Sequence, residues 1–315
     1  VFSQIDSEVQ AKLAEKYQLV VLNPKQGDIN AQIRQAVVDA DAMIGAGRLL
    51  NESNIATAEK LKIISSVSVG YDNYDVDYLN QKKIWLSNTP HVLTETTADL
   101  AFTLLMSAAR KLPSLDHWTK QGEWQRTVNA TQFGQEIFGK TLGIIGLGHI
   151  GAAIARRGFY GFNMNILYHK RIEKIEVAQQ FNAQYKSLKA LLKQADFVVV
   201  AVDLNSQSKA LIGAQEFALM QKHAVFVNIA RGSVVDEQAL TEALQNRQIF
   251  AAGLDVYQKE PLQQSPLFEL DNVVTLPHIG SATAETRKKM AELAFQNLVD
   301  ALEQRTPRYL VNENF

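Results

Sequence analysis

The sequence predicts an α/β protein made of two Rossmann/flavodoxin-like domains, each with a parallel sheet, with a cleft between them. Its length of 315 residues suits two domains of roughly 100–200 residues each. Short β-branched runs alternate with longer segments of helical spacing, which is typical of βαβ units with helices on both faces of the sheet. A glycine-rich turn at residues 146–151 also follows one such run and opens a helical segment.

The strands are predicted at short apolar runs suited to a buried parallel sheet. These runs are Leu19–Leu22, Ala42–Ile44, Ile63–Val67, Thr141–Ile145, Met164–Tyr168, Phe197–Val202, Ala224–Ile229, Ala251–Leu254 and Val273–Thr275. Between most of them apolar residues recur at helical spacing, as in Glu8–Lys16, Ile29–Val38 and Gln238–Gln245. The order of the runs therefore predicts parallel strands connected by helices.

The alternation of strands and helices breaks near the middle of the chain. Ala98–Lys111 is apolar nearly all round, as expected for a helix buried between two bodies. Leu112–Lys140 is irregular, with two Trp and no clear strand. This break predicts a first domain that ends near residue 90 and a second domain over residues 91–282. The last long helix, Ala284–Leu302, belongs to neither by its pattern, and packing on the first domain would make that domain discontinuous.

The composition excludes several classes of protein. The 32 Lys and Arg residues balance 33 Asp and Glu, so no nucleic acid partner is expected. Cysteine is absent, which rules out disulfides, thiolate metal sites and a Cys nucleophile. The longest apolar runs are far shorter than the roughly 20 residues that span a bilayer, so no membrane partner is expected. We expect a cytoplasmic protein without a metal, although the missing initial Met leaves open whether a leader was removed.

The most specific local signal is the turn Gly146-Leu-Gly148-His-Ile-Gly151, placed between a predicted strand and a predicted helix. This context is the one that a dinucleotide-binding fingerprint requires. Gly146 permits the tight turn, Gly148 lets the backbone approach a pyrophosphate, and Gly151 lets helix and strand pack closely. The N–H groups at the start of the helix, at His149 and Ile150, would face the anion. Glycines serving only a strand–helix turn are the alternative.

The end of the next predicted strand bears on the choice of cofactor. An NAD site usually has Asp or Glu there to bind the ribose 2′-OH, whereas this chain has His169, Lys170 and Arg171. The two cationic side chains would pair with a 2′-phosphate, with Arg171 binding it in bidentate fashion. We therefore expect NADP(H) to be preferred, with NAD(H) also possible. The alternative is a solvated basic loop.

Three polar segments follow predicted strands at the edge of the sheet where a nucleotide would bind. They contain Arg231, Glu260 and His278 respectively. A guanidinium can hold a carboxylate and polarise a carbonyl, and an imidazole can give a proton to the oxygen that hydride transfer leaves negative. A carboxylate beside that imidazole orients it and favours its protonated form. The three side chains are therefore the candidate catalytic residues, against the alternatives of a structural ion pair for Arg231 and a solvated acid for Glu260.

Five ordered motifs together resemble the D-isomer-specific 2-hydroxyacid dehydrogenases through essentially the whole chain. They are SVGYDNYD (Ser68–Asp75), GLGHIG (146–151), NIARGSVVDE (Asn228–Glu237), AAGLDVYQKEP (Ala251–Pro261) and LPHIGSAT (Leu276–Thr283). The resemblance implies that Arg231 binds substrate and polarises its carbonyl, that His278 is the general acid/base, and that Glu260 is its partner. It is strongest to the glyoxylate/hydroxypyruvate reductases and their 2-ketogluconate reductase branch, which implies reduction of glyoxylate, hydroxypyruvate or 2-ketogluconate to the D-2-hydroxy acid.

The resemblance also implies roles that spacing alone does not suggest. The turn at Val69 and Gly70 would bind the substrate carboxylate. Apart from the resemblance, Leu49, Leu50 and the Val69–Tyr71 turn are expected to shape the pocket. Further cofactor contacts are expected at Thr97, Ala230, Asp255 and Gly280. The substrate domain would comprise residues 1–90 and 283–315, the dinucleotide-binding domain residues 91–282, and the protein would be a homodimer. Val202-Asp203-Leu204-Asn205 departs from the family's usual Pro-Leu-Thr, which puts the adenosine-side contacts in doubt.

Two other functions fit parts of the pattern. A 3-phosphoglycerate dehydrogenase would share the motifs, but its cofactor loop is expected to be acidic. A nucleotide-sensing binding protein on the same fold would bind NADPH without turning over a 2-keto acid. The remaining histidines are expected to be bystanders: His117 and His223 show no partner pattern, His149 faces solvent near the phosphate, and His91 follows Pro90 near the cleft.

Overall fold

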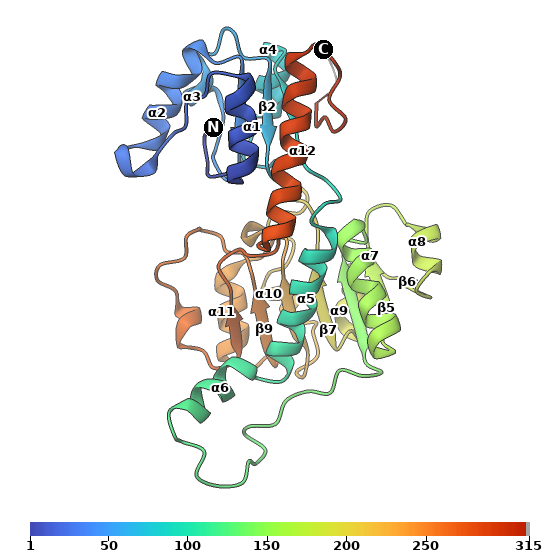
Figure 1. Cartoon of the computed structure of the whole chain (residues 1–315). Helices are drawn as coiled ribbons and strands as arrows, with labels where there is room; N and C mark the ends of the chain where they lie inside the picture. The colour runs from blue at the N-terminus through green and yellow to red at the C-terminus, as the bar shows by residue number, and fades with distance from the viewer. Residues whose placement is uncertain (313–315) are drawn as a thin grey trace. The chain divides into compact units, whose positions relative to one another are not determined.

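The computed structural model describes residues 1–312 and divides into two compact units (Figure 1). The first unit comprises Val1–Leu93 and Ser281–Phe315, and the second comprises Thr94–Gly280. The chain thus passes between units at residues 93–94 and 280–281, where the sequence predicts residues 90–91 and 282–283.

The second unit contains a seven-stranded parallel sheet in the order β10-β9-β8-β7-β4-β5-β6. Its strands are β4 (Thr141–Ile145), β5 (Asn165–His169), β6 (Gln184–Tyr185), β7 (Phe197–Val200), β8 (Val225–Asn228), β9 (Ala251–Leu254) and β10 (Val273–Thr275). The strand order reverses between β4 and β7. Doubly wound folds bind nucleotides at such a switch point, outside the carboxyl ends of the strands. The predicted Rossmann arrangement is confirmed.

Helices cover both faces of this sheet, because its strands are apolar on both sides. One face packs against α5 (Thr94–Ala109), α7 (His149–Arg156) and α8 (Ile175–Gln179). The other packs against α9 (Leu188–Gln194), α10 (Ala214–Phe217) and α11 (Glu237–Gln245). Successive β7 residues alternate between the two cores: Val199 joins the first, and Val198 and Val200 join the second. A helix the sequence does not predict, α6 (Leu112–Lys120), precedes a long irregular segment.

The first unit contains a three-stranded parallel sheet of β1 (Ala42–Gly45), β2 (Ile63–Ser66) and β3 (Trp85–Ser87). Its core packs the sheet against α2 (Ile29–Ala36), α3 (Glu52–Ile55) and α4 (Val76–Lys82). Helix α12 (Ala284–Leu302) lies over β1 and β2 and beside α1 (Ser7–Lys16). The Ser65 hydroxyl donates to the carbonyl of Ala294 in α12 at 2.7 Å. The C-terminal helix therefore belongs to the first unit, which the residue pattern alone left open.

One strand prediction is wrong, and two strands were not predicted. The run Leu19–Leu22 is not a strand, because its backbone hydrogen bonds to a neighbouring segment are limited to two with Val1, too few for a ladder. Trp85–Ser87 and Gln184–Tyr185 form edge strands that the sequence analysis missed. Both are too short to show an apolar run, and Gln184 and Tyr185 are exposed.

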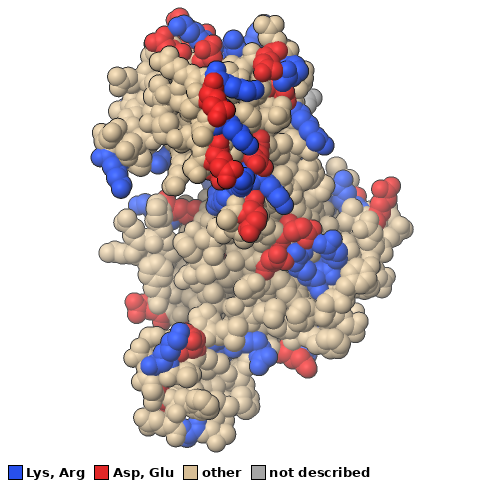
Figure 2. Space-filling view, in the orientation of Figure 1, with Lys and Arg blue, Asp and Glu red and all other residues tan. Residues whose placement is uncertain are grey.

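The surface carries charges of both signs. On the face shown in Figure 2, Lys and Arg side chains lie among Asp and Glu side chains, and no large area of one sign is visible. Among the described residues, no helix combines the length and apolar character needed to cross a bilayer.

Candidate active site

The glycine turn connects β4 to α7, and each of its three glycines has a distinct environment. Gly146 has a φ of +104°, and a Cβ there would lie 2.3 Å from the carbonyl oxygen of Ala201. A Cβ on Gly151 would lie 2.0 Å from the carbonyl oxygen of Gly146, so helix and strand approach as closely as the backbone allows. Only glycine satisfies the first position without strain, and the second has no room for a side chain.

Gly148 differs because a Cβ there would meet nothing within 4 Å, and the residue is exposed. It is also the N-cap of α7, whose first residues are the exposed His149 and the half-buried Ile150. The turn therefore offers open backbone at a helix N-terminus, which is the environment that a pyrophosphate needs. These features fit a dinucleotide cofactor.

The basic loop follows β5 directly. His169 ends the strand, and its Nδ1 lies 3.0 Å from the carbonyl oxygen of Lys186. Burial lowers the pKa of Lys170, with the charges of Lys174 and Arg171 acting in the same direction and Asp203 opposing them. An anion beside Lys170 and Arg171 would relieve this repulsion. The Arg171 guanidinium donates to Oε1 of Gln207 at 2.6 Å, so it is held beside the loop that follows β7.

Arg231 is presented by a loop after β8 that Asn228 folds. The Asn228 amide donates to the carbonyl of Arg231 at 3.0 Å, and its Oδ1 accepts from the backbone N–H of Ala230 at 3.0 Å. The next residue, Gly232, touches the loop after β9: a Cβ there would lie 1.8 Å from the carbonyl carbon of Tyr257. This close approach brings the loop of Arg231 against the loop that carries Glu260.

Glu260 and His278 form a direct pair, with His278 Nδ1 2.7 Å from Glu260 Oε2. The other oxygen of Glu260 accepts from the backbone N–H of Tyr257 at 3.0 Å. His278 has a φ of +53°, an uncommon conformation for a residue with a side chain, which is often found at functional sites. The imidazole is therefore oriented through Nδ1, and Nε2 is the ring nitrogen outside this pair.

Electrostatics favour the ionised form of Glu260. Burial of this carboxyl raises its pKa, but the hydrogen bonds from His278 and Tyr257 and the charges of His278 and Arg231 outweigh burial, so the net pKa is lowered. The contribution from Arg231 shows that all three predicted catalytic side chains share one electrostatic environment. The sequence analysis missed Asn228 and Tyr257 as supporting residues. Tyr257, whose pKa burial raises, donates to the carbonyl of Leu276 at 2.9 Å and so links the loops after β9 and β10.

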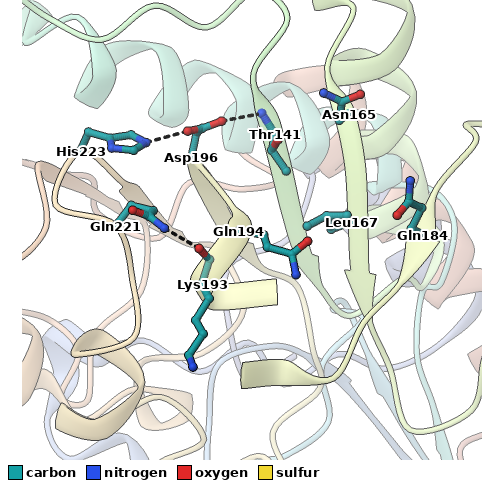
Figure 3. Close-up of a pocket in the computed structure, with 9 residues that line it drawn as sticks. All are labelled: Thr141, Asn165, Leu167, Gln184, Lys193, Gln194, Asp196, Gln221 and His223. Carbon is teal, nitrogen blue, oxygen red and sulfur yellow. Dashed lines mark hydrogen bonds and ion pairs between the residues drawn. The ribbon is translucent and has the colours of Figure 1, made fainter. Parts of the chain in front are cut away.

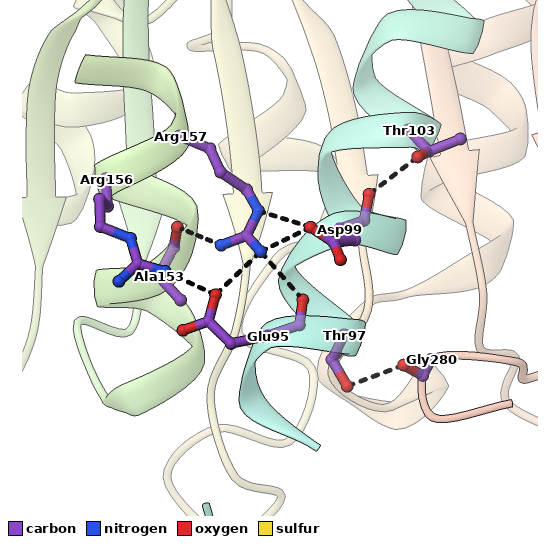
Figure 4. Close-up of polar contacts among 8 residues, drawn as sticks. All are labelled: Glu95, Thr97, Asp99, Thr103, Ala153, Arg156, Arg157 and Gly280. Atoms are coloured by element: carbon purple, nitrogen blue, oxygen red, sulfur yellow. Dashed lines mark hydrogen bonds and ion pairs between the residues drawn. The ribbon is translucent and has the colours of Figure 1, made fainter. Parts of the chain in front are cut away.

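Asp255, Gly280 and Thr97 form a connected group near His278, of which Figure 4 shows the contact between Thr97 and Gly280. The carboxylate oxygens of Asp255 accept from the backbone N–H groups of Ile279 at 2.7 Å and Gly280 at 2.8 Å. The Thr97 hydroxyl, on the first turn of α5, donates to the carbonyl of Gly280 at 2.9 Å. Burial raises the pKa of Asp255, opposed by the two backbone hydrogen bonds and the charge of His278. These residues shape the loop that carries His278. Their predicted contacts with the cofactor, and that of the buried Ala230, stay predictions.

The predicted substrate residues of the first unit differ in exposure. Val69 and Gly70 are half-buried in a turn after β2, where the carbonyl of Val69 accepts from the Asn88 amide at 2.9 Å. Leu49 is 59% exposed, so it is available to a ligand. Leu50 is fully buried in the core of the first unit, and its prediction as a pocket residue is wrong because no ligand can reach it there.

A separate pocket of about 590 Å³ lies at the other edge of the second sheet, near the residues where several strands begin (Figure 3). Its lining consists of Thr141, Asn165, Leu167, Gln184, Lys193, Gln194, Asp196, Gln221 and His223. His223 is an exposed turn residue, as expected, and its Nε2 lies 2.6 Å from Asp196 Oδ1, a partner that no sequence pattern indicates. Asp196 also accepts from the N–H of Thr141, which ties the starts of β4 and β7 together. Because parallel strands point away from this edge, the pocket is distinct from the site of Arg231 and His278.

Among residues 1–312, no three His, Asp or Glu side chains are grouped where they could hold a metal ion.

Comparison with known proteins identifies the class. Residues 102–280 match the model of the D-isomer specific 2-hydroxyacid dehydrogenase NAD binding domain. This match covers more than half of the chain, and the chain belongs to the D-isomer-specific 2-hydroxyacid dehydrogenase family. It is an NAD(P)-dependent oxidoreductase with a nicotinamide cofactor.

Several proteins similar to this chain are named as reductases. The chain is 42% identical over 313 residues to glyoxylate/hydroxypyruvate reductase B of Enterobacter sp. (strain 638), covering 99% of this chain and 97% of the relative. It is 46% identical over 283 residues to the protein of that name from Salmonella heidelberg, covering 90% and 87%. A solved NADPH-dependent glyoxylate/hydroxypyruvate reductase from Sinorhizobium meliloti, in complex with NADP and malonate, has a TM-score of 0.87 at 32% identity, covering 99% and 95%.

Proposed function

We propose that the protein reduces a small 2-keto acid, glyoxylate or hydroxypyruvate, to the D-2-hydroxy acid with NADPH. The observation that carries this proposal is the His278–Glu260 pair, 2.7 Å apart, on the same sheet edge as Arg231 and the dinucleotide turn. The named reductases that resemble the chain over nearly its whole length support the substrate class. A 2-ketogluconate substrate rests on the sequence resemblance alone.

In the proposed reaction the bound nicotinamide supplies a hydride to the carbonyl carbon. Arg231 holds the substrate carboxylate and polarises the carbonyl, which favours the charge that develops on the carbonyl oxygen. His278 gives this oxygen a proton from Nε2, and Glu260 keeps the ring oriented through Nδ1 and stabilises its protonated form.

The first unit is proposed to supply the rest of the substrate site. The backbone N–H groups at Val69 and Gly70 would bind the carboxylate, and Leu49 would contact the substrate's side chain. In the second unit, Thr97, Ala230, Asp255 and Gly280 are proposed to lie against the nicotinamide end of the cofactor. These assignments define residues 1–90 with 283–315 as the substrate domain and residues 91–282 as the cofactor domain.

The test is steady-state reduction of glyoxylate and hydroxypyruvate, compared with pyruvate, 2-ketogluconate and 3-phosphohydroxypyruvate, with NADPH and with NADH. We expect the highest kcat/KM for one of the first two acids with NADPH. Fastest turnover of 3-phosphohydroxypyruvate with NADH would indicate the phosphoglycerate dehydrogenase alternative. NADPH binding without turnover of any acid would indicate a nucleotide-sensing protein.

Replacement of Arg171 should change the choice of coenzyme. In Arg171→Ala we expect KM for NADPH to rise by roughly 10- to 100-fold, since a charge-assisted contact to phosphate contributes about 1.5–3 kcal/mol, while KM for NADH changes little. The matched control is Lys174→Ala, which removes a nearby cation that is not among the predicted cofactor residues His169, Lys170 and Arg171. Equal changes in both KM values for Arg171→Ala would contradict NADPH preference.

The lowered pKa of Glu260 predicts how the stability of the pair depends on pH. Glu260 keeps its charge below the ordinary carboxyl range, so any stability from the pair is fully present above that range and is lost as pH falls toward the lowered pKa of Glu260. The amide of Glu260→Gln does not titrate. We expect the difference in Tm between wild type and Glu260→Gln to be constant above about pH 6 and to decrease between about pH 6 and about pH 3. A difference in Tm that is the same at all these pH values would contradict this role.

The homodimer is proposed from the family resemblance. The irregular segment after α6 carries exposed apolar side chains, including Trp124, Val128, Phe133 and Phe138, which is unusual for a surface in contact with water alone.

A further inference from the structure

Arg157, just after α7, has a side chain that is only 20% exposed and uses all three of its guanidinium nitrogens. Nε donates to Asp99 Oδ1 at 2.8 Å, and Nη1 donates to the carbonyl of Ala153, one turn back in α7, at 2.9 Å. Nη2 donates to the carbonyl of Glu95 at 3.2 Å and lies 2.9 Å from its carboxylate. A single side chain therefore joins the cofactor helix α7 to the start of α5 (Figure 4).

The same start of α5 is attached on its other side to the catalytic loop. Thr97 lies between Glu95 and Asp99 in sequence and donates to the carbonyl of Gly280, two residues after His278. The fit is close, because a Cβ on Gly280 would lie 3.3 Å from Asp255 and 3.5 Å from Thr97. Packing of this density transmits a displacement, since few voids exist to absorb it.

We propose that Arg157 is a positioning residue, which fixes the first turn of α5 between the pyrophosphate-binding helix and the His278 loop. It contacts neither substrate nor cofactor, and acts through Thr97 and Gly280 on the placement of His278 relative to α7. This role rests on the proposed function, because it concerns the distance between a bound nicotinamide and His278, the proposed general acid.

Geometry explains why an arginine is needed. Its planar fork reaches a carboxylate, a second carboxylate and two main-chain carbonyls at once, whereas the ammonium of a lysine is a single point charge. The neighbouring Arg156 provides a contrast, because its side chain is 53% exposed and pairs with the carboxylate of Glu95. Exposed pairs of this kind contribute little to stability.

The test compares Arg157→Met with the matched control Arg156→Met, using kcat and KM for both substrates, the Kd of NADPH and the Tm. In Arg157→Met we expect kcat to fall by roughly 10- to 100-fold, the effect of misplacing reacting groups by about 1 Å. Arg156→Met should stay within about twofold of wild type, as exposed ion pairs do. Arg157→Lys should recover only part of the loss. Equal kcat for the two Met variants would overturn the proposal, even if Arg157→Met had a lowered Tm.

A double-mutant cycle with Thr97→Val separates positioning from general destabilisation. If Arg157 acts through Thr97, the loss of kcat in the double variant should be clearly smaller than the product of the two single losses. Independent, multiplicative losses would overturn the proposal. If Arg157→Met does not fold, Asp99→Asn takes its place in the cycle. This substitution removes the carboxylate that accepts from Arg157, and it does so at an exposed side chain. Wild-type enzyme that turns over no 2-keto acid would refute the proposed function instead, so the two failures are distinguishable.

Discussion

His278→Ala should lower kcat/KM for reduction by roughly 10²- to 10⁴-fold, the range contributed by a positioned general acid. The loss should fall mainly on kcat, because the imidazole acts on the oxygen only as charge develops there. The Kd of NADPH, measured by nucleotide fluorescence, should change little, since the dinucleotide turn lies on other loops. Steady-state kinetics at saturating NADPH is the measurement.

The chain offers a matched control in His223→Ala. His223 is also paired with a carboxylate, at 2.6 Å from Asp196, but at the opposite edge of the same sheet. This variant should keep kcat near the wild-type value. Wild-type turnover by His278→Ala with an intact fold would remove His278 from the mechanism.

Arg231→Ala should produce the second large effect, a loss of roughly 10²- to 10³-fold in kcat/KM, as expected when one donor to a developing negative charge is removed. Here KM for the keto acid should rise as well as kcat fall, because the guanidinium also binds the carboxylate in the ground state. Arg231→Lys should recover only part of the activity, since lysine lacks the planar fork.

Arg247→Ala is the control for Arg231, because it removes an exposed ion pair with Asp271 in the same unit. We expect wild-type kinetics from it. If Arg231→Ala changes kcat while KM for the keto acid is unaffected, the carboxylate-binding role is incorrect.

Much of the second unit can be read from its sequence because its determinants are local. The runs at Thr141–Ile145 and Ala251–Leu254 are strands with the predicted bounds. A short run that is apolar on both sides is stable only when both of its faces are buried, as they are in a parallel sheet covered by helices. The glycine turn is predictable for the same reason: the backbone demands of Gly146 and Gly151 are set by their immediate neighbours.

Features that depend on distant residues could not be read from the sequence. His223 and Asp196 are 27 residues apart, and their pairing follows from the register of two strands. Leu50 is buried while Leu49 is exposed, although the two leucines are adjacent and chemically identical. Leu19–Leu22 has the composition of a strand, but strand formation needs a neighbour that supplies a ladder of hydrogen bonds.

The proposed reaction of the site of Arg231 and His278 is hydride transfer from NADPH to the carbonyl carbon of a small 2-keto acid. It is tested by turnover of glyoxylate and hydroxypyruvate with NADPH that carries deuterium at the transferable position of the nicotinamide ring, followed by mass spectrometry and chiral analysis of the product. We expect one deuterium at C2 and, for hydroxypyruvate, D-glycerate alone. A product without deuterium, an L-product, or no product from an enzyme that binds NADPH would contradict it.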